Sequence, residues 1–141
     1  MSHVQPRRWV ILLAIALPTL LLHGCGGSGA SGPVKRVTQQ QTVDRLTIAL
    51  EAPERPQPLA EQDVVVTLTD SSGKPVDGAQ VWLALMMPAH PMSPNEPDAT
   101  PTGNGHYRAK AIFTMSGTWN LEVHVTVQGQ EHIASFHAQT P

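Results

Sequence analysis

The chain has little of several residue types on which common protein functions depend. Cys25 is its only cysteine, so a disulfide within the chain is impossible. Aromatic residues make up 4% of the sequence and charged residues 14%, and no basic patch is present, which disfavours nucleic-acid binding. There is no nucleophile motif, no HExxH and no glycine-rich phosphate loop, so we do not expect an enzyme.

The N-terminus is typical of an exported protein. Arg7 and Arg8 precede an uncharged apolar run over residues 9–22, which is shorter than the roughly 20 residues that span a bilayer. The run ends in Leu22-His23-Gly24-Cys25, which resembles the lipobox of bacterial lipoproteins. We therefore expect a signal peptide over residues 1–24 and a lipidated Cys25 that anchors the protein in the cell envelope, facing the periplasm or the exterior. Gly26 favours the outer membrane if the host is Gram-negative.

The rest of the chain predicts a linker followed by one small β domain. Residues 25–42 are rich in glycine and serine at their start and are expected to be flexible, with the domain over residues 43–141. Thirteen prolines and the lack of a long 3.6-residue period argue against helices. Apolar residues alternate with polar ones, as in Leu46, Ile48 and Leu50, which indicates strands. Six to seven such strands with turn signals between them predict an all-β, immunoglobulin-like β-sandwich.

Particular residues can be placed in this sandwich. We expect the aromatic side chains in the core, glycines at structural turns, and four histidines mostly on outward, solvated positions of strands. The core aromatics are Trp82, Tyr107, Phe113 and Trp119; the turn glycines are Gly78, Gly105 and Gly117; the histidines are His106, His124, His132 and His137. Strand 79–86 is apolar on both faces, so it is expected to be central or covered on both sides.

Residues 87–104 are expected to form a long loop, because proline recurs almost every third residue and cannot donate to a central ladder. Met87, His90 and Met92 lie in it, and Met115 in a later turn could join them. Thioethers and imidazoles are soft to borderline ligands that favour Cu(I) over hard cations. The preceding Met86 is expected to fill the core; Met87 could do the same, and Met115 could instead cap the core under Trp119.

Four motifs in order resemble the YtkA-like family, and the FixH-related proteins share their general layout. They are Asp77-Gly-Ala-Gln-Val81, Met87-Pro-x-His-x-Met92, Gly105-His-Tyr107 and Phe113-Thr-Met-Ser-Gly-Thr-Trp119. The resemblance implies a small immunoglobulin-like domain outside the cytoplasm, connected with copper handling or oxidase assembly. His90 stands where methionine is common in that family. The alternatives are a metal-free, non-enzymatic module that docks on a membrane complex, such as an oxidase or a transporter, and a passive envelope lipoprotein.

Overall fold

The computed structural model describes residues 33–141, apart from the side chains of Pro91 and Met92. The predicted signal peptide, the predicted lipidation site Cys25 and the first residues of the predicted linker lie outside these residues. Ser31–Pro141 forms one compact unit with its own hydrophobic core. Nothing in the described part of the chain is a helix long and apolar enough to cross a membrane.

The described residues form an all-β fold, with nine strands rather than six to seven. The strands are β1 (Arg36–Val43), β2 (Leu46–Pro53), β3 (Glu61–Thr69), β4 (Gln80–Met87), β5 (His90–Asn95), β6 (Asp98–Gly103), β7 (His106–Ile112), β8 (Gly117–Val127) and β9 (Gln130–Thr140). They follow the order β1-β2-β3-β7-β6-β4-β8-β9, and β5 pairs with β4. β6 pairs first with β4 and then with β7, so it joins the two faces of the sandwich. β4 lies between β6 and β8, which confirms its predicted central place.

The predicted alternation places the core correctly. Inward residues of β2, β3, β7 and β8 are buried while their neighbours face out, because successive side chains of a strand point to opposite faces. The largest fully buried side chains include Tyr107, Phe113 and Phe136, and Phe113 meets Trp119 edge to face with ring centroids 5.5 Å apart. Three of the four predicted core aromatics are therefore confirmed.

Trp82 and His132 are not where the sequence predicted them. Trp82 is half-buried on the outer face of β4, opposite the buried Val81 and Leu83, and stacks on His124 with ring centroids 3.7 Å apart. His132 points inward from β9 and is only 7% exposed, with its Nδ1 atom 3.5 Å from Asp44 Oδ2. In both cases the place of the residue in the in–out alternation of its strand decides whether its side chain faces the core, whatever the residue type.

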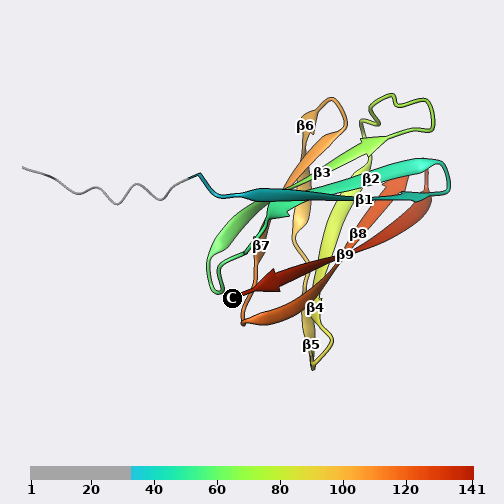
Figure 1. Ribbon diagram of the computed structural model, residues 1–141. Helices are drawn as coiled ribbons and strands as arrows, with labels where there is room; N and C mark the ends of the chain where they lie inside the picture. The colour runs from blue at the N-terminus through green and yellow to red at the C-terminus, as the bar shows by residue number, and fades with distance from the viewer. Residues whose placement is uncertain (1–32) are drawn as a thin grey trace, which may run out of the picture. The chain divides into compact units, whose positions relative to one another are not determined.

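Residues 36–42, expected to be part of the flexible linker, form strand β1. No apolar alternation marks this strand, and backbone pairing with β2 holds it instead. The side-chain amides of Gln39 and Gln41 complete its other edge, because they donate to His137 O and Ser135 O of β9, both at 2.7 Å, and accept from the same residues' N–H groups at 3.4 and 3.0 Å. The two outer strands of the order, β1 and β9, thus lie beside each other and nearly close the sheet into a barrel (Figure 1).

The expectation of a long loop over residues 87–104 is also wrong. β4 turns through Pro88 and Ala89 directly into β5, and β6 follows after two residues. Proline is tolerated here because β5 pairs only with β4 and the β6 ladder shifts its register next to Pro101. Most of residues 87–104 therefore form strands at sheet edges and not a loop. The β4–β5 hairpin lies at one end of the domain (Figure 1).

The Asp77-Gly and Gly105-x-Tyr motifs meet in a hydrogen-bonded corner. Asp77 Oδ1 accepts from Gly105 N at 2.7 Å, while the Tyr107 hydroxyl donates to Val76 O at 2.9 Å and accepts from Ala79 N at 3.0 Å. Gly78 and Gly105 both have positive φ, which glycine adopts without steric cost. These residues fix the connection between β3 and β4 against the start of β7.

Candidate metal site

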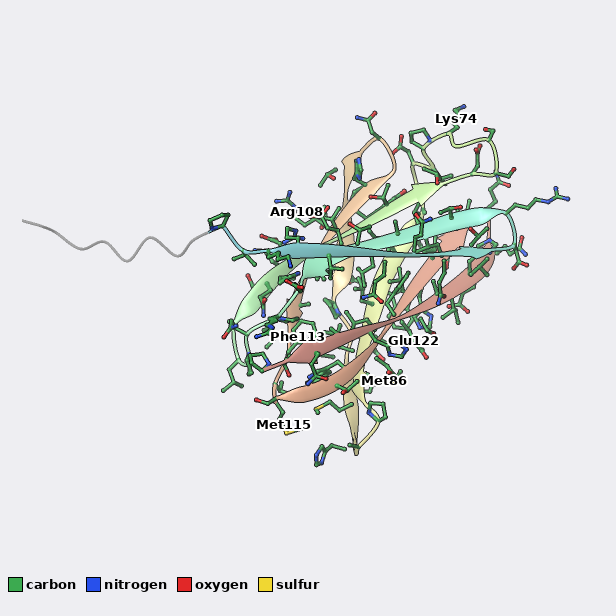
Figure 2. All side chains as sticks on the ribbon, viewed as in Figure 1. Lys74, Met86, Arg108, Phe113, Met115 and Glu122 are labelled. Atoms are coloured by element: carbon green, nitrogen blue, oxygen red, sulfur yellow. The ribbon has the colours of Figure 1, made fainter. Side chains whose placement is uncertain are left out.

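A small hollow lies where the β4–β5 hairpin meets the turn before β8. It encloses about 50 Å³, and three of its walls are the soft donors Met86, Met87 and His90. Figure 2 shows Met86 and Met115 at the lower end of the molecule, where β5 is labelled in Figure 1. The remaining residues that line it are Leu85, Ser93, Asn95, Thr114 and Trp119.

Met86 and Met87 line the hollow from opposite faces of the end of β4. The ladder of β4 with β8 is regular through Met86, and burial alternates, with Met87 in the core and Met86 half-buried on the other face. The irregular partner is β5: Leu85 pairs with Asn95 and Met87 with His90, so five steps along β5 face two steps along β4. His90, Ser93 and Asn95 of this irregular strand line the same hollow.

Met87 is fixed more firmly than the other donors. It is 8% exposed and belongs to the hydrophobic core, whereas Met86 is half-buried and His90 is exposed. Its terminal methyl lies over Gly117, where a Cβ atom would come within 2.8 Å. A residue with a side chain at position 117 would therefore push the Met87 thioether, so this glycine serves the site as well as the turn.

The turn of the Phe-x-Met-x-Gly-x-Trp motif supports the other side of the hollow. The Met115 carbonyl accepts from Trp119 Nε1 at 3.1 Å and from Thr140 Oγ1 at 2.9 Å. Met115 itself is partly buried against the core. Asn95 ties the hairpin to the same region by donating to Ile112 O at 3.1 Å. Both walls are therefore held by hydrogen bonds that do not use the donor atoms.

The hollow carries no formal charge from its known walls. None of the described side chains that line it is a carboxylate. Within residues 33–141 no group of three or more His, Cys, Asp or Glu side chains is placed to hold a metal ion. Any ion bound here would therefore depend on thioether and imidazole donors, which suit a soft monovalent ion better than Mg²⁺ or Ca²⁺.

The structure thus brings together two of the four predicted ligands, Met87 and His90, in one hollow. Met115 lies on the adjoining turn, and the side chain of Met92 lies outside the description. Met86, which the sequence assigned to the core, lines the hollow. Strand alternation places Met86 on the face opposite Met87, so the sequence carries no direct signal for its contribution.

Two of the other histidines have ring nitrogens committed elsewhere. His124 has Nδ1 at 3.1 Å from Glu131 and Nε2 at 3.6 Å from Glu122. His106 Nδ1 lies 2.9 Å from Thr67 Oγ1 on the other side of the sandwich. Neither lines the hollow.

These features define a small all-β domain with a soft-donor hollow at one end. A family profile described as YtkA-like matches residues 40–124. The chain belongs to the YtkA-like family. A search of curated proteins finds no match.

Proposed function

We propose that this protein is a lipid-anchored, extracytoplasmic copper-binding protein that holds or delivers Cu(I) through the hollow at the β4–β5 hairpin. The observation that carries the proposal is the gathering of Met86, Met87 and His90 around one cavity of about 50 Å³. The role is non-enzymatic: the ion is cargo, bound and passed on.

The donor chemistry supports Cu(I) in particular. Thioethers are neutral and do not titrate, so they remain ligands across the pH range of an exposed compartment. Soft donors select Cu(I), whereas oxygen-rich sites select hard divalent ions. Ser93, Asn95 and Thr114 add neutral polar atoms at the rim, which can hold water around an entering ion.

The residues would have different roles. Met87 would supply a fixed donor from the floor, because the core holds it. His90 is exposed at the hairpin and would close over the ion. Met115 would be a further donor from the neighbouring turn, and Met92 is proposed from the sequence alone.

The location of the protein at the membrane is part of the proposal. Lipidation at Cys25 would anchor the domain, because two or more acyl chains give stable membrane attachment. A Cys25→Ser variant produced in a bacterial host should move from the membrane fraction to the soluble fraction and lose incorporated radiolabelled palmitate. Retention of label in that variant would contradict lipidation at this residue.

The deciding experiment is a competition titration. The unit of residues 31–141 is titrated with Cu(I) against a chromogenic chelator, under anaerobic and reducing conditions. We expect one-to-one binding, weakened at least about tenfold in Met87→Leu and in His90→Gln, since each removes a direct ligand. His106→Gln is the matched control, because it removes an exposed imidazole from the opposite side and should leave the affinity unchanged.

Failure of the wild-type domain to compete would overturn the copper proposal. The remaining hypothesis would then be a module that docks on a membrane partner, such as an oxidase subunit or a transporter. Crosslinking of the membrane-anchored protein in cells would test that alternative.

A further inference from the structure

Trp119 lines the same hollow as the soft donors. It points inward from β8 and is 3% exposed, and it belongs to the hydrophobic core together with Met87. The ladder of β4 with β8 is regular up to the pair of Met86 and Asn120. One further step along this ladder places Met87 opposite Trp119. Because both side chains point inward, their Cβ atoms are expected about 5 Å apart on the same face of the sheet.

The indole ring of Trp119 is held by two contacts of different kinds. Its only donor, Nε1, gives its hydrogen to Met115 O at 3.1 Å. The Phe113 ring packs against it at an angle of 87°, with ring centroids 5.5 Å apart, and can cover at most one of its two faces. The N–H is therefore not available to the hollow, and what the ring can offer there is its apolar surface and its π electrons.

The small size of the hollow limits where an ion in it can lie. A hollow of about 50 Å³ is only a few ångströms across, so an ion inside it is close to every wall. An ion bonded to the Met87 sulfur would therefore also lie beside Trp119. The face of an aromatic ring attracts a cation within about 6 Å of the ring centroid, and tryptophan does so most strongly.

Core packing alone is the simpler interpretation of the two neighbours. A methionine sulfur packs favourably against an aromatic ring, and both residues belong to the core. Packing alone, however, would be served best by filling the space between the side chains, because protein interiors are close-packed. Here a hollow remains, and it is bordered by Met87, by Trp119 and by the exposed His90.

We propose that Trp119 is the aromatic wall of the ion site and that a soft monovalent ion is held between the indole ring and the Met87 thioether. This inference rests on the proposed function. The ring adds attraction for a cation without adding a charge or a titrating group, and it keeps water away from the side of the ion that faces the core. Hard divalent ions keep oxygen ligands around them, so an aromatic wall also favours Cu(I) over Mg²⁺ or Ca²⁺. The ring forms no covalent bond to the ion, and no electron is transferred.

The first test uses the tryptophan emission of the unit of residues 31–141. This unit contains two tryptophans, Trp82 and Trp119. Trp82 lies on the outer face of β4, stacked on His124, so Trp82→Phe leaves Trp119 as the only indole without touching the hollow. The variant is titrated with Ag(I), which has the charge and the ligand preference of Cu(I), in a chloride-free buffer. We expect the Trp119 emission to be quenched and the quenching to saturate at one ion per protein. In the reciprocal variant Trp119→Phe, the emission of Trp82 should not change.

The second test compares two replacements of Trp119 by competition titration with Cu(I). Trp119→Leu should weaken binding about threefold to thirtyfold, and Trp119→Phe should weaken it less, because phenylalanine keeps a π face. Both variants lose the hydrogen bond to Met115 O and reduce the side-chain volume. The difference in affinity between them therefore reports the aromatic ring and not the loss of this bond.

The outcomes separate this inference from the proposed function. Saturable Ag(I) binding in Trp82→Phe without a change in emission would overturn the aromatic wall and leave the hollow as the ion site. Equal Cu(I) affinities of the leucine and phenylalanine variants would overturn it as well. Quenching of Trp82 in Trp119→Phe would put the ion on the outer face of β4 and overturn both proposals. Failure of the wild-type unit to bind either ion would overturn the proposed function and this inference with it.

Discussion

Replacing Gly105 by alanine tests the reasoning about the corner between β3, β4 and β7. Gly105 has φ of +71°, and a Cβ atom there would lie 2.5 Å from Leu68 O and 3.1 Å from both Pro75 Cβ and Val76 N. Two of these three neighbours are backbone atoms already engaged in hydrogen bonds: Leu68 O accepts from Val76 N at 3.0 Å, and Leu68 N donates to Gly105 O at 2.8 Å. Relief of the clash therefore has to break main-chain bonds.

A control variant separates the expected loss of unfolding free energy in Gly105→Ala into two parts. Gly73 has nearly the same backbone angle, φ of +81°, but nothing lies within 4 Å of its Cβ position. Gly73→Ala should therefore show only the cost of a left-handed alanine, about 1–2 kcal/mol. Gly105→Ala should add the cost of overpacking, about 1–3 kcal/mol. A total of about 2–5 kcal/mol is a large part of the 5–15 kcal/mol that stabilises a typical domain.

Urea unfolding of the two variants, followed by tryptophan fluorescence, measures the difference. Trp119 is 3% exposed and reports on the core. Gly105→Ala should unfold at a clearly lower urea midpoint than Gly73→Ala, with an unchanged slope of free energy against urea concentration. Equal midpoints would refute the argument, since they would mean that the close approach of Leu68 and Val76 to Gly105 costs nothing.

Three further predictions concern polar contacts. Tyr107→Phe should lower the free energy of unfolding by about 1–3 kcal/mol, because the hydroxyl bridges two main-chain groups of the β3–β4 connection; unchanged stability would contradict this. Replacing both Gln39 and Gln41 by alanine should speed backbone amide exchange in β1 and at the edge of β9 while the rest of the core stays protected; uniform protection would mean that the amides do not close the sheet. The hydroxyl of Ser72, followed by backbone N–H groups of the same turn, lowers the pKa of Asp70 below its ordinary value of 3.8. Its contribution to stability is present above pH 3.8 and is lost as the pH falls through the lowered pKa, so Asp70→Asn should flatten the acid side of the stability profile, and identical profiles would contradict the assignment.

The fold could be predicted where burial imposes a period of two. Leu46, Ile48 and Leu50, and the corresponding residues of the other inner strands, show this period because one of their faces has to be apolar. β1 shows no such period, since backbone pairing and two glutamine amides stabilise it, and these interactions leave no apolar pattern. β5 and β6 were missed for a different reason. Proline excludes a central ladder but not an edge, and only the tertiary pairing shows which positions are edges.

The candidate site was also predictable only in part. A cluster of soft donors is a property of composition, so Met87 and His90 could be identified from their spacing. The contribution of Met86 depends on how the end of β4 meets the irregular strand β5, which local sequence does not encode. Sequence therefore indicates which atoms are available to bind an ion, whereas strand register decides which of them face the same space.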